Sequence, residues 1–122
     1  MTTQEFYQVA GGNEKDVLDR MMSLKLARKF TGKFMEDDSY ANLCRYMTEG
    51  NRPEAFRAAH TLKGVCQNLG FGKLGTSAGE LTELLRPETE SIPEEAYLLL
   101  EKIKVDYEVL VGAIQEWLAS EE

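Results

Sequence analysis

Apolar residues recur every three or four positions along most of this chain, which is the spacing of amphipathic helices. The longest such stretch covers residues 94–119. Its apolar side consists of Ala96, Leu99, Leu100, Ile103, Tyr107, Leu110, Ile114 and Trp117. No segment shows the sustained alternation of apolar and polar residues that marks a half-buried strand. The pattern therefore predicts an all-α protein.

Capping signals and helix breakers divide the chain into predicted helices. A capping box, in which a polar N-cap residue is followed three positions later by glutamate, occurs at Thr2-x-x-Glu5, Asn51-x-x-Glu54 and Ser91-x-x-Glu94. Pro53 and Pro93 are expected in first turns, where a missing N–H is tolerated, and Ser39 is expected to cap the helix that follows it. We predict helices over residues 2–10, 14–22, 24–35, 40–49, 53–69, 71–85 and 94–119, with a polar loop at 88–91.

A chain of 122 residues, of which 43 % are hydrophobic, is sufficient for one domain with a real core. We predict a single domain over residues 1–122. Amphipathic helices with short connections favour an antiparallel four-helix bundle, with short N-terminal helices capping one end. The pair Met21-Met22 and the aromatic residues Phe30 and Phe34 are assigned to the core.

The charge balance limits the classes of partner. The chain has 21 acidic and 14 basic residues and a formal charge of −7, which argues against nucleic acid and against an anionic membrane surface. No apolar run is long enough to span a membrane, and the N-terminus lacks the pattern of a signal peptide. The two cysteines, Cys44 and Cys66, form no Cys-x-x-Cys pair, so we interpret them as core thiols of a reduced, cytoplasmic protein.

The only histidine of the chain, His60, lies on the predicted 53–69 helix. On a helical wheel of about 100° per residue, the apolar residues Ala55, Leu62, Cys66 and Leu69 fall opposite His60. Its near neighbours on the same side, within about 60°, are Arg57, Lys63, Gly64 and Gln67. The wheel therefore places the imidazole on the solvent side of the helix.

Gly64 is unusual on this face, because glycine in a helix interior costs about 1 kcal/mol relative to alanine. One turn from His60, it is not required for core packing. The absence of a side chain there would let another surface approach the imidazole closely.

The string Ala59-His60-Thr61-Leu62-Lys63-Gly64, followed by Asn68-Leu69-Gly70, resembles the signature of the histidine-containing phosphotransfer (HPt) domain of multistep phosphorelays. The resemblance is close over residues 54–85 and extends to the architecture of the rest. It implies that His60 is phosphorylated on a ring nitrogen, conventionally Nε2. It further implies that Lys63 balances the phosphoryl charge, that Gly64 gives clearance to a partner, and that Gln67 hydrogen-bonds the imidazole or the phosphoryl group. Val65 and Cys66 depart from the Ser or Ala of many members, which is expected to change packing only.

The resemblance also implies the partners. The domain would be a monomer that carries a phosphoryl group between the aspartates of response-regulator receiver domains, with a hybrid sensor histidine kinase upstream. A neutral imidazole is a competent nucleophile at cytoplasmic pH, and phosphoryl transfer needs in-line approach and charge neutralisation above all. The receiver would supply magnesium and the acceptor carboxylate, so no cofactor is expected in this chain. No ATP-binding element is evident, and autonomous kinase activity is not expected.

Two other function classes remain as alternatives. A helical adaptor could use the same bundle without phosphoryl chemistry, but it would have no reason to keep the face formed by His60, Lys63 and Gly64. An enzyme in its own right is disfavoured, because the chain shows no second histidine and no nucleophile–base pair.

Two other sequence features are interpreted as structural, without a binding function. Residues 70–75 match G-x-G-x-x-G but follow an amphipathic helix instead of a strand, so we predict a helix–helix turn and no nucleotide site. The acidic run at 36–38 lacks the spacing of a calcium loop and is interpreted as a solvated turn. Whether Lys73, Arg57 or Phe56 belongs to a docking surface beside His60 is left open, as is a docking role for part of the 24–35 helix.

Overall fold

A computed structural model of the chain describes residues 1–86 and 91–120. This part contains α-helices and no strand, so the all-α prediction is confirmed. The helices are α1 (Thr3–Ala10), α2 (Glu14–Met21), α3 (Leu24–Phe34), α4 (Ser39–Glu49), α5 (Arg52–Leu69), α6 (Gly72–Leu85) and α7 (Glu94–Ala119). Every predicted helix is present, with bounds within two residues of the expected ones.

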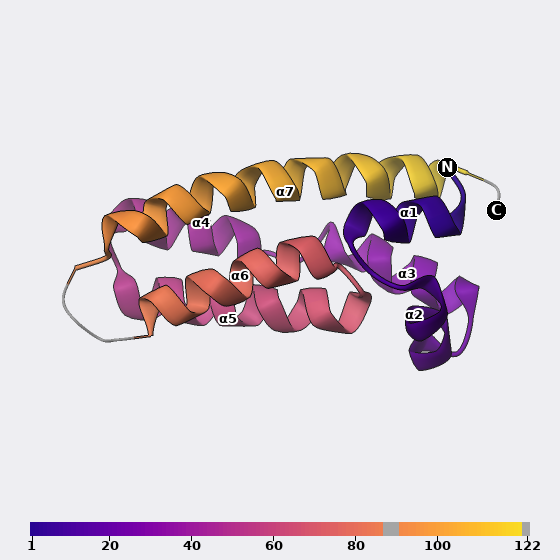
Figure 1. Cartoon of the computed structure of the whole chain (residues 1–122), viewed down its shortest axis with the longest axis horizontal. Helices are drawn as coiled ribbons and strands as arrows, with labels where there is room; N and C mark the ends of the chain where they lie inside the picture. Colours follow the sequence, from indigo (N-terminus) through magenta and orange to yellow (C-terminus); the bar gives the residue numbers. More distant parts are fainter. Residues whose placement is uncertain (87–90, 121–122) are drawn as a thin grey trace.

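Helix α7 runs along the length of the molecule (Figure 1). Helix α5 packs against both α4 and α6, and α6 packs against α7. Helix α1 lies against the C-terminal part of α7, at the end of the molecule where α2 and α3 are also found (Figure 1). None of the helices in the described residues combines the length and the apolar content that a membrane span requires.

The predicted apolar side of α7 is largely buried. Leu99 and Tyr107 are half-buried, whereas the fully buried members are Ala96, Leu100, Ile103, Leu110, Ile114 and Trp117. At the far end of α7, the Phe6 ring of α1 stacks on Trp117 with centroids 4.4 Å apart. The indole Nε1 of Trp117 donates a hydrogen bond of 3.1 Å to Thr3 Oγ1. Helix α1 is thus attached to α7 by ring stacking and by a polar contact that satisfies the buried indole.

The last carbonyl groups of α5, α6 and α7 are capped from elsewhere in the molecule. None of these helices has a basic residue in its own last turn. Instead, Arg20 donates to the carbonyls of Gln67 and Asn68, Arg52 to those of Leu84 and Leu85, and Arg28 to those of Trp117, Leu118 and Ser120. Each guanidinium satisfies otherwise orphaned acceptors and places a positive charge at the negative end of a helix dipole.

One predicted capping box is confirmed in full, and a second is confirmed in its N-cap contact. Thr2 Oγ1 accepts from the Glu5 N–H at 3.1 Å, and Glu5 Oε1 accepts from the Thr2 N–H at 2.8 Å, which is a complete capping box. Asn51 Oδ1 accepts from the Glu54 N–H at 3.3 Å, with Pro53 in the first turn of α5.

The two other N-cap predictions are wrong. Helix α7 is preceded by Pro93 as its N-cap, and no side chain caps it. Ile92, which precedes Pro93, lies outside the helix, in keeping with the bias of a residue before proline toward extended backbone, a bias that Arg52 before Pro53 overcomes at the start of α5. Ser39 lies inside α4, where its N–H donates to Asp37 Oδ1 at 2.8 Å. Of the predicted loop at 88–91, residues 88–90 lie outside the described residues, and Ser91 is exposed.

The assignment of Met22 and Phe30 to the core is also wrong. Helix α2 ends at Met21, and Met22 follows with a left-handed φ of 72°, which leaves its side chain 85 % exposed. Helix α3 buries Ala27, Thr31 and Phe34, so Phe30 falls at the edge of the buried side and is 37 % exposed. The buried positions of α3 are still three and four residues apart. They include Thr31, which its hydropathy would not assign to the core.

The turn between α5 and α6 explains the glycine-rich string at 70–75. Gly70 ends α5 with φ of 80°, in the left-handed region that glycine adopts without strain. A Cβ on Gly72 would lie 2.2 Å from the carbonyl oxygen of Gly11, and a Cβ on Gly12 would lie 2.1 Å from that of Gly70. The glycines therefore allow the turn after α1 and the turn after α5 to touch through their backbones, and the prediction of a helix–helix turn is confirmed.

Candidate functional site

His60 lies midway along α5 and is exposed, as the helical wheel predicts. The opposite side of the helix is buried in the core through Ala55, Leu62, Cys66 and Leu69. This orientation follows from the amphipathic pattern of α5 alone: burying the apolar stripe directs the imidazole to solvent.

Gly64, one turn after His60, stands in open space. A Cβ built on Gly64 would have no other heavy atom within 4 Å, helix backbone aside. By contrast, a Cβ on Gly75 of α6 would lie 3.2 Å from Cys66 Cβ, so that glycine is packed between helices. Gly64 therefore serves no packing purpose, which agrees with its predicted position on the exposed side of α5.

Three contacts show that α5 and α6 are antiparallel. Gly75, Gly79 and Arg86 follow one another along α6. They lie beside Cys66, Lys63 and Phe56 of α5, respectively, whose order along the chain is the reverse. The side-chain stem of Lys63 lies along Gly79, where a Cβ would be 3.5 Å from Lys63 Cδ. Lys63 forms no ion pair within the described residues. Its stem is thus supported by α6. Arg86 and, to a smaller extent, the positive charge of Lys63 lower the pKa of the Glu83 carboxyl of that helix, so the Lys63 charge lies close to this carboxylate.

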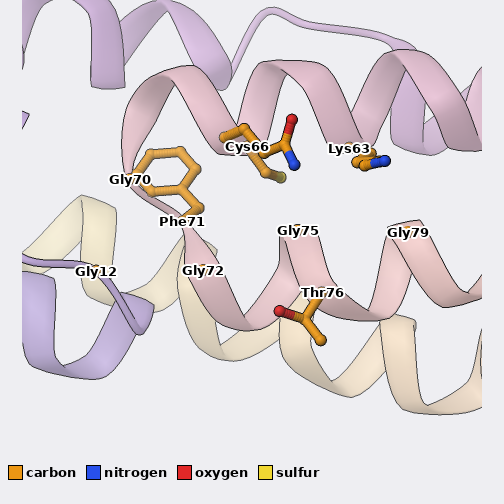
Figure 2. A pocket seen from close by; sticks show the side chains of 10 residues that line it. Gly12, Lys63, Cys66, Gly70, Phe71, Gly72, Gly75, Thr76 and Gly79 are labelled. Atoms are coloured by element: carbon orange, nitrogen blue, oxygen red, sulfur yellow. The ribbon is translucent and has the colours of Figure 1, made fainter.

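A cleft of about 260 Å³ opens between α5 and α6 (Figure 2). Lys63 and Gln67 line it from α5, and Gly72, Gly75 and Gly79 line it from α6. The Gln67 side chain is exposed, and in residues 1–86 and 91–120 no hydrogen bond joins it to His60. The Cys66 thiol also lines this cleft, and burial raises its pKa to about 12, which suits a packing residue and not a reactive thiol.

Phe56, Arg57 and Lys73, whose part in a docking surface the sequence leaves open, lie in different places in the structure. The Phe56 ring lies parallel to the imidazole of His60, with centroids 6.2 Å apart and an interplanar angle of 5°. Arg57 is exposed and forms an ion pair with Glu54. Lys73 lines a separate cleft beside Gly11, Lys102 and Asp106, toward α1 and α7. The structure therefore brings Phe56 to His60 and directs Lys73 elsewhere.

Glu83 and Arg86, at the end of α6, are not among the residues that the sequence pattern selects. The Arg86 Cζ lies 5.3 Å from the centroid of the Phe56 ring, and the Arg86 guanidinium pairs with Glu83 at 3.1 Å. The spacing of the pair, three residues apart on a helix, is visible in the sequence. Its position beside Phe56 depends on the α5–α6 register, which the sequence pattern does not reveal.

An apolar groove of about 390 Å³ lies between α3 and the second half of α5. Met21, Phe30 and Phe34 line it on one side, and Val65 and Leu69 line it on the other. Asn68, which also lines the groove, follows His60 and Gly64 along α5 at intervals of four residues. The groove therefore continues the exposed line of α5 on which His60 stands.

Comparisons with known proteins agree with this geometry. The family model of the Hpt domain matches residues 33–119, which include the whole of α4 to α7 and the exposed histidine. No curated protein and no solved structure matched the chain. In the described residues, no group of three or more His, Cys, Asp or Glu side chains could hold a metal ion. The described part of the chain is all-helical and presents a single histidine on a helix, and the family model matches most of the chain's length. The chain therefore belongs to the Hpt domain family of histidine phosphotransfer proteins in two-component signalling.

Proposed function

We propose that His60 accepts a phosphoryl group from the aspartyl phosphate of one receiver domain and passes it to the aspartate of another. In the forward step a ring nitrogen lone pair attacks phosphorus, and the bond from phosphorus to the aspartate oxygen breaks with its electrons returning to the carboxylate. The observation that carries this proposal is the position of the only histidine: exposed, midway along α5, and one turn from a glycine with open space around it.

The neighbouring residues supply what such a transfer requires. Lys63 places a positive charge near the developing phosphoryl group, and Gly64 leaves room for the receiver's loops. Gln67 offers an amide that can donate to a phosphoryl oxygen. The receiver contributes the magnesium ion and the second reacting carboxylate, so this chain needs no metal of its own.

Receivers, including that of a hybrid sensor histidine kinase, would dock on the exposed side of α5 and on the apolar groove beside it. Phe30 of α3 is an exposed apolar side chain that lines this groove, and such a side chain suits a transient protein interface. As part of the same proposal, α4 to α7 form an antiparallel four-helix bundle, since they pack in succession and α5 and α6 are antiparallel.

The proposal is tested by direct transfer. A receiver domain charged with acetyl phosphate and magnesium is incubated with this chain, and acid-labile, base-stable phosphate is measured on the chain. We expect label to appear on this chain as it is lost from the receiver. A chain that binds the receiver without acquiring label would instead be an adaptor.

Lys63 is expected to tune the transfer without being essential. Exposed single charges contribute about 1 kcal/mol, so Lys63→Ala should slow transfer, or shorten the phosphohistidine lifetime, by up to about tenfold. The measurement is the rate of label transfer and of label loss in parallel with the wild-type protein. If both rates are unchanged, Lys63 does not belong to the site.

Substitutions of Gly64 are expected to change the stability of the fold and the rate of phosphoryl transfer in opposite directions. Because a Cβ there meets nothing, Gly64→Ala should stabilise the fold by up to about 1 kcal/mol, and Gly64→Gln by less. The longer glutamine side chain would enter the space required for in-line approach, where reacting atoms must come within about 3–3.5 Å. We therefore expect Gly64→Gln to raise the melting temperature and to reduce transfer from a receiver strongly.

Phosphorylation by a small donor supplies the control for that prediction, because a small molecule does not need the cleared surface. Gly64→Gln should impair it less than it impairs transfer from a receiver. Wild-type transfer rates in Gly64→Gln would show that the glycine does not provide access.

A further inference from the structure

The side of α6 that lies beside α5 carries charged residues whose positions follow from the helix register. Gly79 lies beside Lys63, and Arg86 lies beside Phe56. Because the helices are antiparallel, Glu83, midway between Gly79 and Arg86, falls at the level of His60 on the neighbouring helix. Glu83 and Arg86 of α6 therefore lie near the level of His60 along the neighbouring helix, and Lys63 lies one turn after His60 on α5 itself.

Arg86 is connected to His60 through Phe56. The guanidinium carbon lies 5.3 Å from the Phe56 centroid, and the Phe56 ring is parallel to the imidazole at 6.2 Å. Phe56 is half-buried and packs against the core, so it is a fixed platform for the guanidinium. The end of α6 is fixed as well, because Arg52 donates to the carbonyls of Leu84 and Leu85.

The guanidinium itself is only loosely held. Its partner is Glu83, through contacts of 3.2 Å from Nε and 3.1 Å from Nη2 to the two carboxylate oxygens. Both side chains are more than half exposed, at 54 % for Arg86 and 62 % for Glu83. Exposed pairs of this kind contribute little to stability, so a stronger anion nearby can displace the carboxylate.

We propose that Arg86 is a second cation of the phosphorylation site, which leaves Glu83 and binds the phosphoryl oxygens once His60 is phosphorylated. This inference rests on the proposed function. A phosphoryl group offers a planar guanidinium up to two parallel charge-assisted hydrogen bonds, as the Glu83 carboxylate does, but carries more negative charge. The same negative charge repels the Glu83 carboxylate, so phosphorylation weakens the resting pair while it attracts Arg86.

The chain provides a matched control in Arg45 of α4. Its guanidinium carbon lies 4.6 Å from the Tyr46 ring and its Nε lies 3.9 Å from Glu49, so it too combines an aromatic platform with an acidic partner. Both Arg86→Gln and Arg45→Gln remove one exposed charge that lies over a ring. Only Arg86 is connected to His60.

The experiment measures the lifetime of phosphohistidine on the full chain after the receiver has been removed. Arg86→Gln should shorten this lifetime by about threefold to fivefold, and Arg45→Gln should leave it at the wild-type value. Glu83→Gln should lengthen the lifetime by about twofold, because it frees Arg86. The double variant should behave like Arg86→Gln alone. Opposite effects from the two members of one ion pair would not arise from a merely structural role.

Two outcomes separate this inference from the proposed function. Label that decays equally fast on the wild-type protein, Arg86→Gln and Arg45→Gln would overturn the role of Arg86 and leave the phosphotransfer function intact. A wild-type chain that acquires no label would overturn both. A melting temperature measured on each preparation verifies that the variants are folded.

Discussion

Replacing His60 with glutamine is expected to abolish phosphoryl acceptance and to leave the fold intact. His60 is the only histidine of the chain, so no other imidazole can take over as nucleophile. The side chain is exposed on α5, and substitutions at such positions usually change the free energy of unfolding by less than about 0.5 kcal/mol. Loss of labelling would thus be a chemical effect and not a consequence of unfolding.

The measurement is receiver-dependent labelling of the variant, with helical content and melting temperature recorded on the same preparation. Glu116→Gln is the control, because Glu116 is exposed on α7, outside the proposed docking surface, and should tolerate glutamine without loss of labelling. Acid-labile phosphate on His60→Gln would show that the phosphorylated residue is a different one.

Alanine at Gly12 or Gly72 is expected to cause the largest loss of stability of any glycine substitution in this chain. The added Cβ would lie 2.1 Å from the Gly70 carbonyl oxygen in the first case and 2.2 Å from the Gly11 carbonyl oxygen in the second. Both obstructing atoms belong to backbone, so no side-chain rotation relieves the clash. Overpacking typically costs 1–3 kcal/mol, and we expect about 3 kcal/mol here, because two turns must separate.

Chemical denaturation compares these variants with Gly64→Ala and Gly112→Ala. A Cβ at either of those two helical positions meets nothing within 4 Å, so these variants should be as stable as the wild-type protein or slightly more stable. A Gly12→Ala protein with wild-type stability would contradict the backbone contact between the two turns.

The sequence was sufficient for features that depend on one helix at a time. The apolar stripe of α5, from Ala55 to Leu69, determines which way His60 points, and the order of the helices follows from breakers such as Gly50 and Gly70. The sequence predictions are wrong where the backbone conformation of a turn determines the direction of a side chain. The hydropathy of Met22 predicts a core position, but its own left-handed backbone conformation after α2 directs its side chain to solvent.

Features that depend on two helices at once could not be predicted. Arg86 and Glu83 are ordinary surface charges in the sequence, and only the register of α6 against α5 brings Arg86 to Phe56. The family match begins at residue 33 and so leaves out α1, α2 and most of α3, although Phe6 of α1 stacks on Trp117 near the end of α7. Such contacts join distant parts of the chain and leave no periodic signal.

The arginines that cap α5, α6 and α7 have a consequence for how the molecule opens. Each one joins the end of a helix to a residue between 32 and 92 positions away in the chain. Helix ends ordinarily fray on their own, but these ends lose their caps only when other helices move away. Amide hydrogen exchange in the last turns of α5 to α7 should therefore follow cooperative unfolding. A receiver would then meet a rigid surface, and little conformational entropy would be lost when it binds.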